Sequence, residues 1–368
     1  MLSKSRLIDN FVDMVKIDSP SMKEINMANW LIEYLEKRGI NVIIDDAGKK
    51  FGGNSGNVIA YIKGKSNQEP ICFAAHMDQV QPCISVNPII ERNIIKTDGN
   101  TTLGGDDKAG IAVILEAVES ILEDDIPHRD IYLLFTVSEE FELLGAKNFD
   151  SKNLPCKNVV ILDAGGPTGI IAYKAPAQES IEVKFYGRKA HAGIEPEKGL
   201  NAILVASNAI SSMNIGRLDE FTTSNIGRIE GGGATNIVTD EVTFTAEIRS
   251  HIPNRLKEEI NYMKKCCDIA ANKFNTTYEF KHKNSYPSFE LSKDSYIFKL
   301  SEYAIKKVGL EPNPMVIGGG SDANIIANLG YECAILSLGI YQVHTVNEYV
   351  NIDELYSATE IVYNMMIV

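Results

Sequence analysis

The chain has 368 residues, of which 44% are hydrophobic and 23% charged, an ordinary globular mixture that is long enough for two hydrophobic cores. Its net charge of −13 argues against a nucleic-acid partner, because nucleic acids bind to basic surfaces. No apolar run approaches the roughly 20 residues that span a bilayer, and acidic residues interrupt the N-terminal segment where a signal peptide would be apolar. The six cysteines include no CxxC pair, so we expect reduced thiols. Together these features predict a cytoplasmic protein without a membrane partner.

The first 176 residues alternate between helical and strand-like segments. Segment 5–38 has the pattern of amphipathic helices, broken at Asp18-Ser19-Pro20. The apolar spacing from Ile111 to Ile121 predicts a helix over 109–122. Short apolar strands are expected at 42–44, 58–62, 71–75, 131–137 and 159–162. This alternation is typical of an α/β domain with a mostly parallel sheet flanked by helices.

The middle of the chain has a different pattern. SIEVKFY at 180–186 alternates strictly, which predicts a half-exposed antiparallel strand. Further elements are expected at 199–213 and 254–273 (helices) and at 225–229, 242–248 and 277–283 (strands). We interpret 177–285 as an inserted α+β (ferredoxin-like) domain, and 1–176 plus 286–368 as the larger domain that surrounds it. The larger domain resumes with a helix over 295–308, strands around Met315 and at 334–338, and a final helix from Asp353.

Acidic and histidine residues stand at the ends of the predicted strands of the larger domain or in the adjacent loops. They are His76, Asp78, Asp106, Asp107, Glu139, Glu140, Asp163 and His344. Taken singly, each has an ordinary explanation as a hydrogen-bonded histidine, a helix N-cap or a turn residue. At the carboxyl ends of parallel strands they would converge, and converging carboxylates repel one another unless cations lie between them. Two imidazoles and three carboxylates suffice for two ions if one carboxylate bridges, and this donor set favours Zn²⁺, with Co²⁺ or Mn²⁺ as alternatives.

These residues lie in motifs whose order resembles that of the M20 family of dinuclear zinc metallopeptidases, and most closely its peptidase T (tripeptide aminopeptidase) branch. The motifs are HMD (76–78), GGDDKAG (104–110), SEE (138–140), ILDAGG (161–166) and the distal His344. Four more stretches resemble the same family: KAHAGIEPEKGLNAI (189–203), GGGATNIVTDEV (231–242), EIRSH (247–251) and GGGSDANIIANLG (318–330).

The resemblance implies a role for each residue of the site. It implies that His76 and Asp163 hold one zinc ion, that Glu140 and His344 hold the other, and that Asp106 bridges them, with Asp107 as a neighbour only. It also implies that Asp78 orients His76 through the second ring nitrogen. Glu139 would be the general base, which takes a proton from the attacking water and passes it to the leaving amine.

The inserted domain contributes further residues by the same resemblance. His191 would steady the oxyanion, often from the partner in a dimer, and Asn236 and Arg249 would contact the substrate carboxylate. Gly320 and Ser321 would bring backbone amides close to the substrate. Arg249 could equally be a surface strand residue, and the glycines a plain turn. Ala192 and Phe141 depart from the family pattern, which often has proline and glycine there, so strict tripeptide specificity stays open.

We therefore expect a zinc metallopeptidase that hydrolyses short peptides, as a tripeptide aminopeptidase, with a homodimer formed through the inserted domain. Two alternatives stay open: an M20 amidohydrolase or carboxypeptidase that acts on N-acyl amino acids or dipeptides, and a non-catalytic binding protein on the same scaffold.

Overall fold

The structure is a computed structural model that describes residues 1–367. The chain divides into two compact units. Unit 2 consists of Ala175–Ser288 together with Gly318–Gly320, and unit 1 consists of the rest of the described chain. The main difference from the division expected from the sequence is that the glycines at 318–320 belong with unit 2.

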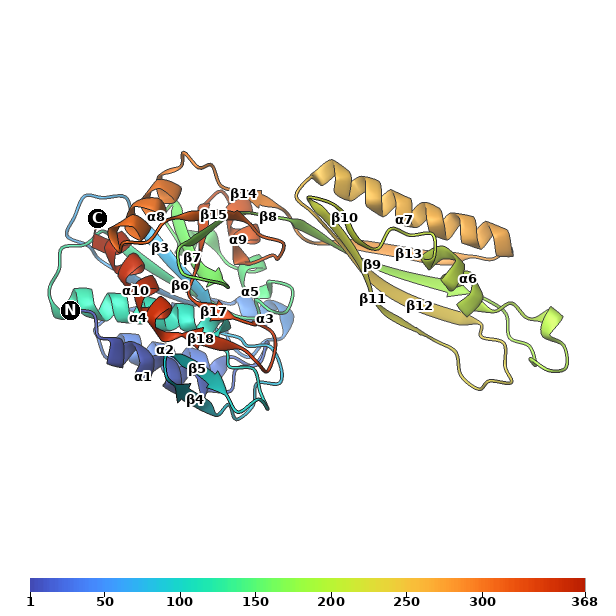
Figure 1. Cartoon of the computed structure of the whole chain (residues 1–368), viewed down its shortest axis with the longest axis horizontal. Helices are drawn as coiled ribbons and strands as arrows, with labels where there is room; N and C mark the ends of the chain where they lie inside the picture. The colour runs from blue at the N-terminus through green and yellow to red at the C-terminus, as the bar shows by residue number, and fades with distance from the viewer. Residues whose placement is uncertain (368) are drawn as a thin grey trace. The chain divides into compact units, whose positions relative to one another are not determined.

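Unit 1 is built on a nine-stranded sheet whose centre is parallel (Figure 1). The strand order is β1-β2-β6-β3-β7-β16-β8-β14, and β15 pairs with β8. Neighbouring strands run parallel from β6 to β16, whereas β1, β2 and β8 pair antiparallel with the main path. The bounds are β1 Val42–Ile44, β2 Val58–Ile62, β3 Ile71–His76, β6 Ile131–Thr136, β7 Asn158–Ala164, β8 Ile170–Ala175, β14 Phe289–Glu290, β15 Asn313–Val316 and β16 Glu332–Ser337. Strand β3 is buried along its whole length, which explains its unbroken apolar sequence.

Helices cover this sheet, and α4 is the most deeply buried of them. It packs on β3 and β7 and contacts α1 and α10, which lie beside it in Figure 1. The helices of unit 1 are α1 Lys4–Val15, α2 Ile25–Glu36, α3 Ala47–Phe51, α4 Gly105–Glu123, α5 Leu144–Lys147, α8 Tyr296–Lys307, α9 Asp322–Ile326 and α10 Ile352–Ile367. Serine side chains cap α1 and α8 by accepting a hydrogen bond from a backbone N–H of the first turn, Ser3 from Arg6 and Ser295 from Phe298.

A second, four-stranded antiparallel sheet in unit 1 was not expected from the sequence. Its order is β17-β18-β5-β4, with β4 Pro88–Glu91, β5 Ile94–Thr97, β17 Ile340–Tyr341 and β18 Tyr349–Asn351. The β17–β18 connection, residues 342–348, carries His344, so this small sheet fixes both ends of the loop that presents the histidine.

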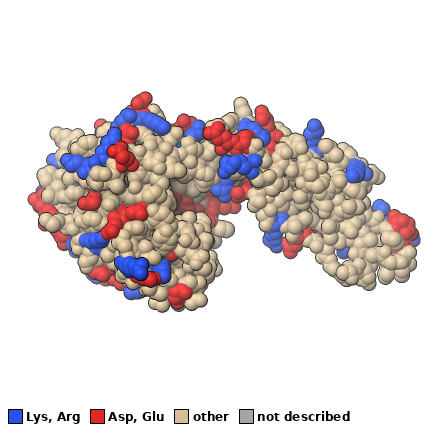
Figure 2. Space-filling view, viewed as in Figure 1, with Lys and Arg blue, Asp and Glu red and all other residues tan. Residues whose placement is uncertain are grey.

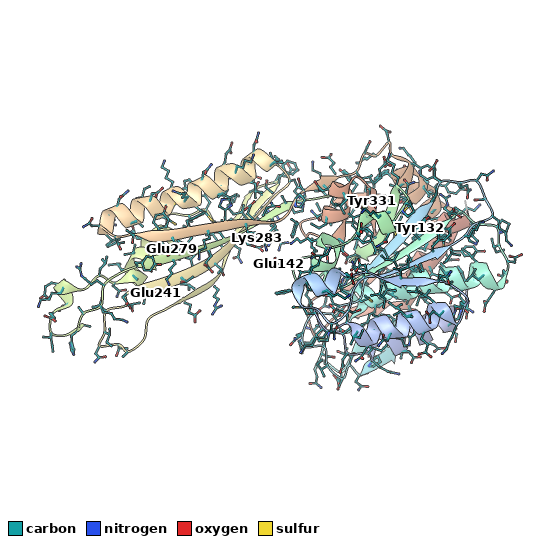
Figure 3. All side chains as sticks on the ribbon, turned by 180° about the vertical axis from the view of Figure 1, so that it is seen from behind. Tyr132, Glu142, Glu241, Glu279, Lys283 and Tyr331 are labelled. Carbon is teal, nitrogen blue, oxygen red and sulfur yellow. The ribbon has the colours of Figure 1, made fainter. Side chains whose placement is uncertain are left out.

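Unit 2 has the β-α-β-β-α-β order and the strand arrangement of a ferredoxin-like domain, with one extra edge strand. The sheet order is β10-β11-β12-β9-β13, and every pair is antiparallel. The bounds are β9 Ala177–Tyr186, α6 Ala202–Ile210, β10 Gly216–Asp219, β11 Thr222–Gly231, β12 Glu241–Ser250, α7 Pro253–Phe274 and β13 Tyr278–Tyr286. Alternate residues of β9 are buried beneath α6 and α7, and the intervening ones are polar or exposed. The labelled Glu241, Glu279 and Lys283 lie on the strands of this sheet (Figure 3). The expected fold class is thus confirmed for both units.

Charged groups of both signs are interspersed on the face of the molecule seen in Figure 2. All six cysteines are free. Within residues 1–367, no helix is both long and apolar enough to cross a membrane.

Candidate metal centre

The side chains of the centre come from the carboxyl edge of the parallel strands and from two adjoining segments. His76 is the last residue of β3, Asp163 lies near the end of β7, and Glu140 follows β6. Strand β3 lies between β6 and β7, so these three ends are neighbours. Asp106 comes from the first turn of α4 and His344 from the β17–β18 loop. The structure thus brings together the five residues expected to bind metal.

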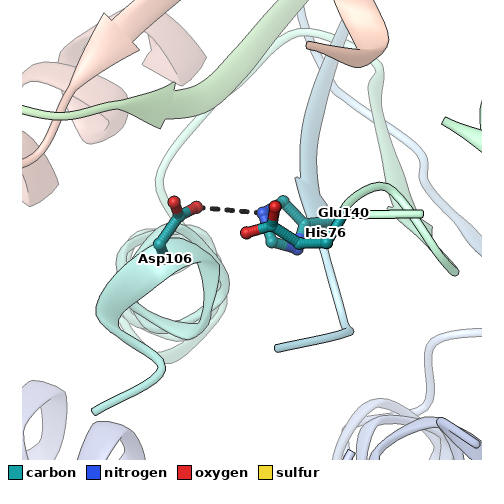
Figure 4. A group of neighbouring side chains, drawn as sticks. All are labelled: His76, Asp106 and Glu140. Carbon is teal, nitrogen blue, oxygen red and sulfur yellow. Dashed lines mark hydrogen bonds and ion pairs between the residues drawn. The ribbon is translucent and has the colours of Figure 1, made fainter. Parts of the chain in front are cut away.

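Asp106 lies between the two histidines. Its Oδ1 is 3.0 Å from Nε2 of His76, and its Oδ2 is 3.2 Å from Nε2 of His344. Figure 4 shows His76 and Glu140 on the same side of the Asp106 carboxylate. Each oxygen of Asp106 therefore faces a different imidazole, which is the placement a bridging carboxylate requires.

A second carboxylate accompanies each histidine. Nε2 of His76 is 3.8 Å from Oδ1 of Asp163, and Nε2 of His344 is 2.8 Å from Oε1 of Glu140. The five side chains thus form two groups, one around each histidine, with Asp106 common to both. Each group has one imidazole nitrogen and two carboxylates at close range.

Asp107 has ligand-capable oxygens within 4.8 Å of His76 and Asp163, yet both of its oxygens are occupied. Oδ2 accepts a hydrogen bond from the backbone N–H of His76 at 3.2 Å, and Oδ1 accepts one from that of Gly110 at 3.2 Å. The side chain is fully buried. These contacts make Asp107 a support for the end of β3 and the start of α4, and favour Asp106 as the ligand.

Asp78 supports both sides of the centre. Nδ1 of His76 lies 3.0 Å from the Asp78 carbonyl oxygen and 3.4 Å from its carboxylate, which leaves Nε2 directed toward Asp106. The Asp78 carboxylate also accepts hydrogen bonds from the backbone N–H groups of Glu139 at 2.9 Å and Glu140 at 3.2 Å. It therefore fixes the acidic loop as well as the histidine, and the second of these contacts was not expected from the sequence.

The electrostatics show a concentration of negative charge that protein groups alone do not neutralise. Burial raises the pKa of Glu139 and of Asp163 well above the ordinary range, and the charges of neighbouring carboxylates, Asp163 for the first and Asp106 for the second, raise them further. Burial lowers the pKa of His76, but the carboxylates of Asp106 and Asp78 more than offset this, so that it lies well above 6.5. Hydrogen bonds that the His344 ring donates to the carboxylates of Asp106 and Glu140 raise the pKa of His344 to about 10.

The donor set fits divalent cations. Without them, these carboxylates must take up protons or hold the imidazoles in the charged form; with them, the carboxylates ionise and the imidazoles bind as neutral ligands. Imidazole and carboxylate donors without a thiolate suit zinc, cobalt or manganese.

Glu139 is directed differently from its neighbour Glu140. Glu139 is 8% exposed and forms no ion pair with His76 or His344. It is nevertheless close enough for its charge to raise the pKa of His76, and for the charge of Asp163 to raise its own pKa. A buried carboxylate next to the centre, with a raised pKa, has the properties of a group that accepts and returns a proton.

The candidate residues of unit 2 fall into two places in that unit. His191 and Asn236 lie on adjacent loop segments, joined by a hydrogen bond from the backbone N–H of Ala192 to the carbonyl oxygen of Asn236 at 2.9 Å. Both side chains are exposed. Arg249 lies elsewhere, on β12, where its Nε and Nη2 bind both oxygens of Glu247 at 3.0 and 3.1 Å. Its Nη1 is directed to the carbonyl oxygen of Gly318 at 3.4 Å.

The two remaining candidates have clear structural tasks. A side chain at Gly320 would collide with the ring of Tyr286, because a Cβ there would lie 2.3 Å from Cζ. Ser321 caps α9: its Oγ accepts from the N–H of Ala323, and Asn324 completes a capping box. The Ser321 side chain is thereby engaged within the protein.

Two buried glutamates beside the centre were missed by sequence reasoning. Glu348 accepts hydrogen bonds from the backbone N–H groups of Leu103, Gly104 and Asp106. Glu24 binds Ser138, directly before the acidic pair. Neither stands in a recognisable motif, although Glu348 follows His344 by only four residues.

Comparison with known proteins places the chain in a family. The model of peptidase family M20/M25/M40 matches residues 72–367. The chain belongs to this family. It is 39% identical to the uncharacterised protein YqjE of Bacillus subtilis, over 98% of each chain. A crystal structure of aminopeptidase PepT from Bacillus cereus superposes with a TM-score of 0.91 at 36% identity, covering 99% of this chain and 98% of that one. The crystal structure of a tripeptidase from Staphylococcus aureus superposes with a TM-score of 0.96 at 36% identity, covering 100% of this chain and 98% of that one.

Membership of M20 confirms the expectation of an enzyme that hydrolyses peptide bonds, and the cluster of ligand-capable groups agrees with a divalent metal in the site.

Proposed function

We propose that this M20 peptidase removes the N-terminal residue of short peptides, tripeptides above all, with two zinc ions held in the centre. The PepT aminopeptidase and the tripeptidase that share its fold over the whole chain support the reaction and the substrate length. One observation carries the proposal: the two oxygens of Asp106 face two separate histidine–carboxylate groups.

His76 and Asp163 would hold one ion, His344 and Glu140 the other, and Asp106 both. Two metal ions held in this way would lower the pKa of a bound water molecule and polarise a carbonyl oxygen of the substrate. The protein supplies the geometry: Asp78 fixes the His76 ring and the amides of Glu139 and Glu140.

Glu139 would act as the general base. Its carboxylate takes a proton from the attacking water and delivers it to the nitrogen of the leaving peptide as the C–N bond breaks. Burial keeps this carboxyl's affinity for the proton high, so that it holds the proton between the two transfers.

In unit 2, Arg249 would bind the carboxylate of the substrate. Glu247 occupies the Nε–Nη2 edge of its guanidinium, and Nη1 makes a 3.4 Å contact with the carbonyl oxygen of Gly318, so a second carboxylate would bind at the Nη1–Nη2 edge. We propose that His191 stabilises the oxyanion of the tetrahedral intermediate and that Asn236, on the adjacent loop segment, contacts the substrate.

We also propose a homodimer formed through unit 2. Large apolar side chains are exposed on unit 2, and they include Ile194 at 75% and Leu204 at 56% exposure, with Ile203, Ile229 and Ile237. Leu204→Glu should convert the dimer to a monomer in light scattering; a wild-type chain that is monomeric at high concentration contradicts this assignment. The six free cysteines support a reducing, cytoplasmic location.

The deciding experiment uses zinc-loaded protein and a matched peptide set. Trialanine, its N-acetyl form, its C-terminal amide and dialanine are digested in parallel, and the products are identified by mass spectrometry. We expect free alanine and dialanine from trialanine, and no cleavage of the N-acetyl peptide. Faster cleavage of N-blocked substrates would instead identify an amidohydrolase or carboxypeptidase of the same family.

A further inference from the structure

The segment Ser19–Glu24, between α1 and α2, lies against two loops, the one that follows His76 and the one that carries the acidic pair. The hydroxyl of Ser21 donates to the Asp78 carboxylate at 2.6 Å, and the N–H of Met22 donates to Oγ of Ser138 at 2.9 Å. The N–H of Gln79 donates to the carbonyl oxygen of Ser19 at 3.0 Å. A segment more than 50 residues away in sequence thus bonds to both loops.

Glu24 makes the densest set of contacts in this segment. Its Oε1 accepts three hydrogen bonds, from the N–H of Met22 at 2.8 Å, the N–H of Ser138 at 2.9 Å and the hydroxyl of Ser138 at 2.7 Å. Its Oε2 is buried and has no hydrogen-bond partner within residues 1–367. The whole residue is 0% exposed.

A buried carboxyl with one unpartnered oxygen is costly. Burial, followed by the charge of Asp78, raises the pKa of Glu24 to about 7. Well-packed apolar residues would serve the stability of the fold as well or better. The placement of this glutamate therefore calls for a reason beyond stability.

The contact with Ser138 gives such a reason, because the unusual backbone conformation of Ser138 has to be stabilised. Its φ is 51°, in the left-handed region that a non-glycine residue enters only at a cost. Ser138 immediately precedes Glu139, so its conformation sets the direction in which the next side chain leaves the backbone. Both hydrogen-bond donors of Ser138, the N–H and the hydroxyl, are bound by Glu24.

We propose that Glu24 is a positioning residue for the general base: by fixing both donors of Ser138, it sets the direction of Glu139. The inference rests on the proposed function of Glu139. The Asp78 carboxylate accepts hydrogen bonds from the N–H groups of Glu139 and Glu140 whether or not Glu24 is present. Loss of Glu24 should therefore change the orientation of the Glu139 side chain and leave the metal ligands in place.

The test compares Glu24→Ala with Glu24→Gln in the zinc-loaded full chain. In Glu24→Gln, the carboxamide oxygen still accepts the three bonds, so we expect kcat within about threefold of wild type. Glu24→Ala removes the acceptor; a base displaced by about 1 Å should lower kcat by roughly 10- to 100-fold. KM and bound zinc should stay at wild-type values in both variants.

A second buried glutamate gives the matched control. Glu116 is also 0% exposed, and it binds Arg6, Ser120 and the N–H of Ser3, far along α4 from the centre. Glu116→Ala should destabilise the fold and leave kcat unchanged. Equal loss of kcat in Glu116→Ala and Glu24→Ala would show a general effect of instability and overturn the assignment. So would wild-type kcat in Glu24→Ala, or loss of zinc in place of loss of kcat.

Ser138→Ala provides the same test if Glu24→Ala does not fold. It deletes the hydroxyl but leaves the N–H bond to Glu24. We therefore expect kcat below the wild-type value by less than about 100-fold, and no further loss when Glu24→Gln is added. Unchanged kcat in Ser138→Ala would count against the proposal. If the wild-type chain itself has no zinc-dependent peptidase activity, the proposed function fails, whereas an active wild type with unaffected Glu24 and Ser138 variants refutes only the positioning role.

Discussion

Glu348 offers the sharpest prediction about how the centre is built. It is 1% exposed and its carboxylate accepts the backbone N–H groups of Leu103, Gly104 and Asp106 at 2.8, 2.9 and 2.9 Å. These bonds hold the turn that carries the proposed bridging ligand. Glu348→Ala removes all three acceptors at once.

The size of the effect follows from these contacts. An unpaired buried donor costs about 1–3 kcal/mol, so three cost about 6 kcal/mol at the middle of the range. Burial, and then the charge of Asp106, raises the pKa of Glu348 to about 7. At pH 8 the folded protein therefore holds an ionised, buried carboxylate that destabilises it by roughly 3 kcal/mol, at about 1.4 kcal/mol per pKa unit, and Glu348→Ala removes this cost. We expect a net loss of about 3 kcal/mol in the free energy of unfolding.

The assay is urea unfolding of the metal-free variant at pH 8, together with zinc titration of the folded form. Groups that orient a metal ligand typically contribute 10- to 100-fold in metal affinity, and we expect a loss of that size. Glu348→Gln keeps one acceptor oxygen and should lie between Glu348→Ala and wild type in both measurements. An alanine variant with wild-type unfolding free energy and zinc affinity would refute the reasoning.

Three further predictions concern the acid–base and substrate groups. Glu139→Gln should retain both zinc ions and lose kcat by roughly 10²- to 10⁴-fold, and retained turnover would reject it as the general base. Arg249→Ala should raise KM for tripeptides by about 10- to 100-fold and leave KM for the matching C-terminal amides unchanged; an equal effect on both would argue against carboxylate binding. Burial raises the pKa of Glu24 from 4.5 to about 7, so between these pH values the folded state binds more protons than the unfolded state. The free energy of unfolding should therefore fall as the pH rises from 4.5 to 7. Glu24→Gln should remove this dependence, worth roughly 3 kcal/mol, from urea unfolding of the metal-free protein; an unchanged pH slope would contradict it.

The parallel centre of the main sheet could be predicted because β3, β6 and β7 are almost entirely buried, whereas β8 and β14 were not expected from the sequence. Segments such as Ile71–His76 and Ile131–Thr136 are continuous apolar runs, and their polar residues begin where the strands end. The alternating pattern of β9 likewise predicted a sheet with one covered face. In these cases the local pattern directly records burial.

The small sheet around the His344 loop could not be predicted, because its strands are only two to four residues long and depend on pairing between distant segments. β18 pairs with β5 more than 250 residues away. The same is true of the contacts that support the centre: Glu24 and Glu348 bind backbone N–H groups, which every residue except proline offers, so no side-chain pattern marks the partner. Sequence reasoning found the candidate ligands, and Asp78 beside His76, because their residue types are chemically distinctive, and it missed the supporting glutamates Glu24 and Glu348.

The most direct test of the account is a zinc titration of the metal-free protein, with bound metal counted by mass spectrometry and trialanine hydrolysis followed in the same samples. Two ions per chain in the wild type, with activity rising as the sites fill, and a reduced count in Asp106→Asn are the predicted results. A wild-type chain that binds no zinc, or that hydrolyses the peptide equally well in the presence of a chelator, would contradict a centre bridged by Asp106.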